Sequence, residues 1–234
     1  MIKHACVMVL VVGCSGGSDH GTVALTDLGA QLGTSYCTKE FSCCTDAEIM
    51  MDFGAFKVGG QPVTTEPLCE MFYAGLFGSV VSGEYMVSLA NGRITYDGDA
   101  AGACLGVIDS MSCSEFGAQS KIDSDTGCTQ FLIPHVADGG ACAQSYECTS
   151  NYCSGATTQP LQDGMCMPLP TSGQACEFTC ADGTFCDFST ETCQPLKANN
   201  AACSSNDACT SEFCNGAGTG SGTCADKPAR CDGI

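Results

Sequence analysis

The residues of this chain best suited to chemistry are its cysteines, which number 22 among 234 residues. A density this far above ordinary globular usage is typical of a disulfide scaffold or of a metal-binding protein. Metal sites favour cysteine pairs separated by two residues and followed by further cysteines or histidines. The closest separated pair here is Cys176 and Cys180, with three residues between them, and the chain has three histidines. The spacing favours disulfides, and no metal or cofactor is expected.

Twelve cysteines in the C-terminal part form three units of four. The first unit, Cys142 to Cys166, and the third, Cys203 to Cys224, have a gap of five residues and then a gap of four. The middle unit, Cys176 to Cys193, has gaps of three and five. An aromatic residue precedes each third cysteine: Tyr152, Phe185 and Phe213. The period predicts tandem modules with little regular secondary structure, at residues 139–170, 173–197 and 200–227.

Units this small need cross-links because they bury too little apolar surface to offset chain entropy. Of the three pairings open to four cysteines, the sequential one leaves the halves of a unit unconnected, and the nested one places a very short loop inside a long one. Interleaved pairing keeps the first loop at 11, 10 and 11 residues although the inner gaps vary. The expected bonds are Cys142–Cys153, Cys148–Cys166, Cys176–Cys186, Cys180–Cys193, Cys203–Cys214 and Cys209–Cys224. We expect the aromatic side chains to cover these bonds or, alternatively, to contact a partner.

The N-terminus has the composition of an export signal. An apolar run at residues 5–12 is too short to span a bilayer as a helix. The run ends at Val11–Cys14, which resembles a bacterial lipobox, the motif that directs lipidation of its cysteine. The resemblance implies a signal peptide at residues 1–13, a lipid on Cys14 and a flexible tether at residues 14–24. Alternatively, Cys14 is a disulfide partner after ordinary cleavage.

Residues 25–130 have sparse cysteines and helical periodicity, which predicts a small disulfide-bonded α-helical domain of about four helices. Thr45 and Glu48 form a capping-box pattern at the start of one helix. Two apolar stripes indicate buried faces: Leu68, Phe72, Leu76 and Val80, and Ala101, Cys104, Leu105, Ile108 and Met111. Seven half-cystines are expected to face inward: Cys37, Cys43, Cys44, Cys69, Cys104, Cys113 and Cys128. Because seven is odd, one of these cysteines needs a partner outside this region, and Cys231 also has none. We expect Cys231 to bond Cys128, which lies just before the first unit.

The charge of the chain, 26 acidic against 8 basic residues, excludes some partners. Nucleic acids and anionic membrane surfaces bind basic patches, so membrane contact is expected only through the N-terminal lipid. Calcium is a weaker expectation, because residues 123–127 lack the terminal glutamate of an EF-hand loop. Residues 97–99 lie where a helix begins, a place that favours acids in any case. We interpret both clusters as solvated turns.

The cysteine spacing, with Tyr152 before Cys153, resembles the Dickkopf N-terminal cysteine-rich domain over the span from Cys142 to Cys224. That resemblance implies the same interleaved pairing, although the middle unit departs from the spacing. The whole arrangement resembles exported cysteine-rich lipoproteins of myxobacteria and related bacteria. The matching features are Cys14, the Cys43–Cys44 pair, the Gly-Arg-x-x-Tyr-Asp segment at residues 92–97 and the three units. This second resemblance implies the architecture and a location at the outer membrane or cell surface, and it points to no particular activity.

Motifs of catalysis are absent from the sequence, which lacks a nucleophile elbow, a phosphate-binding loop and a zinc-protease motif. His135 is the one histidine outside the expected signal and tether. We therefore expect no catalytic residue. The favoured function is an exported, membrane-anchored binding or structural scaffold with an unknown protein or cell-envelope partner, extracellular if it is not lipidated. The alternative is a hydrolase-type enzyme in the helical domain with the units as an appendage, which a cleft with converging polar groups would favour.

Overall fold

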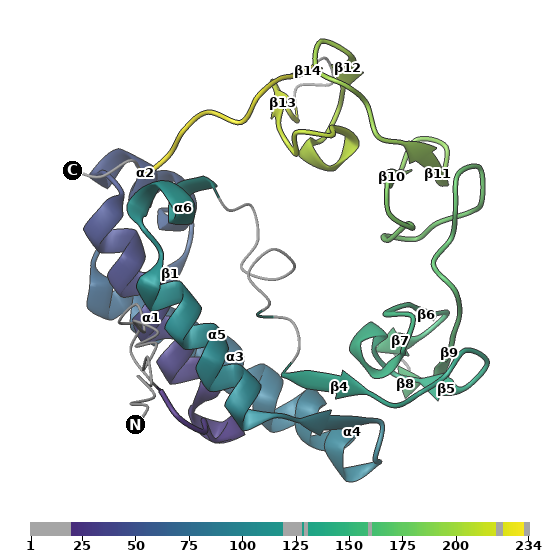
Figure 1. The fold of residues 1–234 in the computed structure, drawn as a ribbon, viewed down its shortest axis with the longest axis horizontal. Coiled ribbons are helices and arrows are strands. Elements are labelled where there is room, and N and C mark those ends of the chain that lie inside the picture. Colours follow the sequence, from purple (N-terminus) through teal and green to yellow (C-terminus); the bar gives the residue numbers. More distant parts are fainter. Residues whose placement is uncertain (1–19, 119–127, 129–130, 159–160, 219–221, 232–234) are drawn as a thin grey trace, which may run out of the picture.

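The computed structural model of the chain describes residues 20–118, 128, 131–158, 161–218 and 222–231. In these residues α-helices occupy the N-terminal part and short strands the C-terminal part, as expected for a small disulfide-rich fold with a helical N-terminal region. From the helical region the chain enters an arc that carries the three cysteine units, and it then returns beside α2 and α6 (Figure 1). The molecule therefore has the outline of a ring.

Six α-helices occur among the described residues, where periodicity predicted about four. They are α1 (Leu25–Cys43), α2 (Asp46–Phe53), α3 (Glu66–Val80), α4 (Met86–Ala90), α5 (Gly98–Ser110) and α6 (Cys113–Ala118), with the π-helical turn η1 (Val81–Tyr85) between α3 and α4. The difference lies in α4 and α6, whose five and six residues are too few to show a period. Helix α1 packs against both α3 and α5 and forms the centre of this region.

Polar side chains determine where two of these helices begin. Thr45 and Glu48 form the predicted capping box of α2, in which the Thr45 N–H donates to Glu48 Oε2 over 2.8 Å. Asp97 caps α5, because its Oδ1 accepts from the N–H groups of Asp99 and Ala100 over 3.0 Å each. The acidic residues at 97–99 therefore belong to a helix N-terminus.

The close approach of α1 and α3 depends on two glycines one turn apart on α1. A Cβ at Gly33 would come within 2.9 Å of Tyr73 Cβ, and a Cβ at Gly29 within 2.5 Å of Phe77 Cβ. Because these glycines have no side chain, Tyr73 and Phe77 of α3 pack directly against α1. The face of α3 that meets α1 therefore differs from the predicted apolar stripe. Leu76, expected in the core, is 47% exposed. The predicted stripe on α5 is buried as expected.

A short antiparallel pair leads from the helical region into the first cysteine unit. Strand β3 (Ile94–Tyr96) pairs with β4 (Leu132–Pro134), with Thr95 opposite Ile133. The two strands lie far apart in the chain, because β4 follows α6.

The first and third cysteine units have the same sheet. In the first, β5 (Ala141–Cys142), β9 (Gly164–Cys166) and β6 (Cys153–Ser154) pair in that order; in the third, β12 (Ala202–Cys203), β14 (Gly222–Cys224) and β13 (Cys214–Asn215) do so. The second unit has the hairpin of β10 (Thr184–Asp187) and β11 (Thr192–Pro195). The other short elements are the pairs β1 (Lys57–Val58) with β2 (Gln61–Pro62) and β7 (Thr157–Thr158) with β8 (Leu161–Gln162), and the 3-10 turns η2 (Ser145–Glu147) and η3 (Asn206–Ala208).

One turn opens all three units with the same hydrogen bond. The N–H groups of Gly139, Gly173 and Asn200 donate to the carbonyl oxygens of the fourth cysteines over 2.8, 2.8 and 2.7 Å. Their φ angles are 85°, 83° and 71°, a region that glycine adopts freely and asparagine more readily than most residues. Turn residues as well as cysteines therefore specify each unit.

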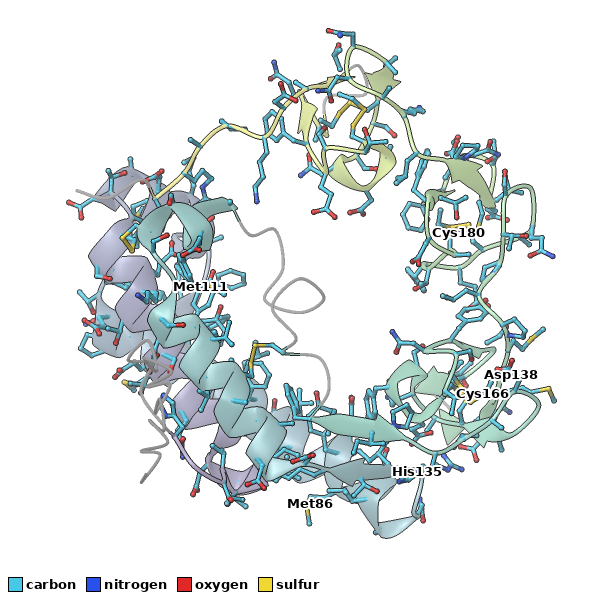
Figure 2. All side chains as sticks on the ribbon, in the orientation of Figure 1. Met86, Met111, His135, Asp138, Cys166 and Cys180 are labelled. Atoms are coloured by element: carbon cyan, nitrogen blue, oxygen red, sulfur yellow. A yellow bond between two sulfur atoms is a disulfide. The ribbon has the colours of Figure 1, made fainter. Side chains whose placement is uncertain are left out.

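Ten disulfides join the half-cystines of the described residues. In the units they are Cys142–Cys153, Cys148–Cys166, Cys176–Cys186, Cys180–Cys193, Cys203–Cys214 and Cys209–Cys224, which is the interleaved pattern. Cys166 and Cys180 mark two of these bonds in Figure 2. The other four are Cys37–Cys69, Cys43–Cys113, Cys44–Cys231 and Cys104–Cys128. The pairing of Cys231 with Cys128 from parity is therefore wrong, because α5 holds Cys128 while the chain end returns to α1.

The aromatic residue before each third cysteine has a different environment in each unit. Phe185 is buried and clusters with the cysteines of the third unit rather than with those of its own, so it joins two units. Tyr152 and Phe213 are half-buried.

Candidate functional site

The first cysteine unit is attached to the helical region through a buried carboxylate. Glu147 is fully buried, and its Oε1 accepts a hydrogen bond of 2.5 Å from Ser88 Oγ on α4. Its Oε2 accepts from the N–H of Ala143 over 2.7 Å and lies 3.3 Å from Arg93 Nη1. These partners matter because an unpaired carboxylate in an apolar interior is costly.

Arg93 extends this contact to the surface. Its Nη2 lies 2.6 Å from Asp163 Oδ2 and its Nη1 3.4 Å from Asp163 Oδ1, a two-point contact with the first unit. Beside it, the ring of Tyr85 in η1 meets the ring of Tyr146 edge-on, with centroids 5.1 Å apart. The Gly-Arg-x-x-Tyr-Asp segment at residues 92–97 thus attaches the first unit through its arginine.

The end of the arc is attached to the helical region by a second contact, which we call the C-terminal clasp (residues 227–231). Cys231 bonds Cys44, next to the start of α2, and the Cys231 N–H donates to Glu48 Oε1 over 2.9 Å. This hydrogen bond is the main reason why the pKa of Glu48 is lowered to about 2. A covalent bond and a charged acceptor therefore hold the chain end.

Side chains of the clasp contact α2 and α6. The Arg230 guanidinium donates to the Asp52 carboxylate of α2, and Lys227 Nζ lies 3.4 Å from the carbonyl oxygen of Ala118. A Cβ at Gly117 of α6 would overlap the carbonyl oxygen of Arg230. Glycine is required at this position because the clasp passes directly over it.

Beneath the clasp lies another carboxyl group, Glu40 of α1. It is 2% exposed, and its Oε1 has no hydrogen-bond partner among the described residues. Burial, aided by the hydrogen bond with Asp52, raises the pKa of Glu40 to about 8. These surroundings favour the protonated, neutral form of Glu40, because a charge there would lie beside the Asp52 carboxylate.

A cleft of about 760 Å³ opens between α1–α3, the third cysteine unit and the clasp. Six aromatic side chains line it: Tyr36, Phe53, Phe56, Phe72, Tyr73 and Phe213. Their rings contact one another, as in Phe56 with Phe72 at 4.8 Å and Tyr36 with Tyr73 at 5.1 Å between centroids. A concave, mostly apolar surface of this size with a few polar groups is typical of a binding site. This cleft, which we call the aromatic cleft, is the candidate functional site.

Four charged residues surround the aromatic cleft: Asp52, Glu212, Lys227 and Arg230. Asp52 already binds Arg230, and burial lowers the pKa of Lys227 and raises that of Tyr36. Among the described residues that line the cleft there is no serine, cysteine or histidine to serve as a nucleophile or its base. The arrangement can hold an apolar or aromatic group and place hydrogen-bonding groups around it.

Several residues singled out by the sequence lie elsewhere. His135 is exposed at the end of β4, where its ring contacts the Thr95 hydroxyl (Figure 2). Cys14 and the acidic residues 123–127 lie outside the described residues. Sulfur atoms gather in each unit and beside Glu40, but they are joined in disulfides and offer no thiolate to a metal.

Sequence reasoning missed the residues that attach the arc. The chain has two arginines, Arg93 and Arg230, and each binds a carboxylate at one end of the arc. The rarity of arginine was a usable signal, since arginine is preferred where two-point recognition of a carboxylate is needed. A second signal was Glu147, because the matching position of the third unit is Ala208.

Comparison of the chain with protein-family models, with curated proteins and with solved structures gives no match. None of the helices within the described ranges is long and apolar enough to cross a membrane. Ten disulfides indicate an extracellular or otherwise oxidising environment. The class supported is therefore a cysteine-rich protein of an oxidising compartment.

Proposed function

We propose that this chain is an exported, lipid-anchored binding or structural scaffold, without catalytic activity, that faces the cell envelope or the cell surface. The observation that carries the proposal is the attachment of the arc at both ends, by Glu147 and Arg93 at one and by Cys44–Cys231 at the other. A chain tied in this way resists unfolding and proteolysis, since cross-links restrict the unfolded state. Such a frame suits a protein that presents surfaces outside the cell.

The finer assignments belong to the same proposal. Each cysteine unit is a self-contained module, supported by its own pair of disulfides and by the turn shared by Gly139, Gly173 and Asn200. We also propose that these units are related to the Dickkopf N-terminal domain. The whole chain, on this proposal, belongs with the cysteine-rich lipoproteins of myxobacteria. The partner is a protein or an envelope component, and the aromatic cleft is its first candidate contact.

Anchoring is tested by metabolic labelling with palmitate in a bacterial host, followed by separation of membrane and soluble fractions. We expect label and membrane association in the wild type and the loss of both in Cys14→Ser. Cys6→Ser is the matched control, because Cys6 lies inside the expected signal and its loss should change neither result. Unlabelled wild-type protein in the medium would contradict the anchor.

The alternative, a hydrolase, is favoured by one observation: the carboxyl groups of Asp52 and Glu40 lie close together beside the aromatic cleft. Acid pairs serve hydrolysis in some enzymes. We favour the scaffold because Glu40 is buried and Asp52 binds Arg230. Chromogenic ester, glycoside and peptide substrates distinguish the two. Turnover that disappears in Asp52→Asn would establish the enzyme, and equal background rates in both proteins support the scaffold.

A further inference from the structure

A second hollow, of about 410 Å³, lies between the second and third cysteine units. Phe178 and Phe188 of the second unit border it and are 81% and 64% exposed, with ring centroids 6.2 Å apart. Phenylalanines this exposed lose the benefit of burial, so a pair of them beside a hollow marks an interaction site. The pair belongs to the one unit whose cysteine spacing departs from the other two.

The charged groups that line this hollow are acidic, and threonine hydroxyls lie among them. Its lining residues include Asp182, Asp207 and Glu212. None of the described residues that line it is a lysine, an arginine or a histidine. Lys197, whose Nζ lies 5.6 Å from the ring centroid of Phe185, donates to the carbonyl oxygen of Ala202. Aromatic faces and carboxylates attract the same kind of ligand, an organic cation.

We propose that this hollow binds a lysine or arginine side chain presented by a basic polypeptide segment. This proposal rests on the scaffold function and names the partner chemistry of a second site, which shares Glu212 with the aromatic cleft. The cationic group would lie over the exposed phenylalanine rings within reach of the carboxylates, while apolar neighbours of the same segment cover the rest of Phe178 and Phe188. A second copy of the chain is a poor occupant, because its net charge is −18 and like charges repel.

The test is isothermal titration calorimetry of the full-length protein with two peptides. One is acetyl-Gly-Leu-Lys-Leu-Gly-amide, and the other carries an Nε-acetylated lysine, which keeps the shape and removes the charge. We expect the charged peptide to bind at least about 10-fold more tightly, a ratio that falls as salt is raised. Equal affinities for the two peptides would overturn the proposal.

Variants locate the site without disturbing the fold, because the altered side chains are exposed. Phe178→Ala with Phe188→Ala, and separately Asp182→Asn with Asp207→Asn, should each weaken the charged peptide by about 10-fold. Asp46→Asn, an exposed acid on α2, is the control for overall charge and should leave binding unchanged. If Asp46→Asn weakened binding of the charged peptide as much, the effect would come from net charge alone, and the proposed site would be wrong.

Tetramethylammonium tests the other source of the same chemistry. We expect it to compete weakly, because it lacks the apolar neighbours that cover the phenylalanines. Competition as strong as that of the peptide would overturn the polypeptide partner in favour of a small free cation. Palmitate labelling of Cys14 is independent of all these outcomes, so failure of the peptide experiment leaves the anchoring result standing.

Discussion

The first and third cysteine units show how one disulfide framework is joined to different neighbours. Their first three cysteines lie 61 residues apart and their fourth 58, and their sheets pair in the same order. Cys153 and Cys214 donate their N–H groups to the side chains of Ser145 and Asn206 at matching positions. They differ at one buried position, where the first unit has Glu147 and the third has Ala208.

That position faces the neighbour in both units. Glu147 reaches Ser88 and Arg93 of the helical region, whereas Ala208 packs in a cluster with Phe185 of the second unit. The two units thus share one backbone arrangement, and the residue at this position, Glu147 or Ala208, determines whether the neighbour it contacts is polar or apolar. After the third unit, the chain is held to the helices by the clasp, through the Cys44–Cys231 bond and the contact of Arg230 with Asp52.

The largest effect is expected from Ala208→Glu, which places the side chain of the first unit in the third. Ala208 is fully buried and has no arginine beside it, so the carboxylate would be unpaired and too large for its site. We expect a loss of at least about 4 kcal/mol, enough to prevent correct closure of the third unit. Non-reducing peptide mapping after oxidative refolding measures this, with Ala208→Ser as the milder control.

The converse change, Glu147→Ala, should cost about 3 kcal/mol, because it leaves the buried Ser88 without its acceptor and Arg93 with Asp163 alone. Hydrogen exchange of the first unit and of β3 should rise together. Asp163→Ala is the matched control, since Asp163 binds the same arginine from the surface and its loss should cost about 1 kcal/mol or less. Equal effects of the two variants would contradict the buried role of Glu147.

The pH dependence of stability tests the clasp. The pKa of Glu40 is raised from 4.5 to about 8, so between these values the folded chain keeps a proton that the unfolded chain releases. The free energy of unfolding contributed by Glu40 therefore falls as pH rises from 4.5 to 8, by at most about 1.4 kcal/mol per pH unit. Glu40→Gln mimics the protonated form and should flatten this slope in thermal unfolding. An unchanged slope would mean that Glu40 ionises freely.

The smallest effect is expected from Arg230→Lys. The side chains of Arg230 and Asp52 are 31% and 28% exposed, and the disulfide beside them remains, so we expect a loss of about 0.5–1 kcal/mol. Arg93→Lys should cost more, because Arg93 also serves the buried Glu147 and contacts Asp163 at two points. The reverse order, measured by denaturant unfolding, would contradict the comparison of the two ends.

Local features of this fold followed from the sequence, and features made by distant contacts did not. The capping box at Thr45 and the buried face of α5 depend on residues a few positions apart, so the local sequence pattern predicts them. The exposure of Leu76 depends on Gly29 and Gly33 in another helix, which the pattern of α3 does not contain. The pairing of Cys231 failed for the same reason, because parity counts cysteines without knowing where the chain returns.

The aromatic cleft and the hollow between the second and third cysteine units could not be predicted from the sequence either. Phe56 and Phe213 lie far apart in the chain and line one cleft because the ring closes. Periodicity assigned aromatic side chains to cores, and it had no means of showing that some of them line a surface between two regions.

The measurement that tests the closed ring most directly is a disulfide map of the C-terminal cysteine, made by pepsin digestion at acidic pH and mass spectrometry without reduction. Because Cys43 and Cys44 are adjacent and bond Cys113 and Cys231, we predict one species of three peptides, which contain Cys43–Cys44, Cys113 and Cys231. A Cys231 peptide joined to Cys128, or carrying a free thiol, would contradict the closed ring.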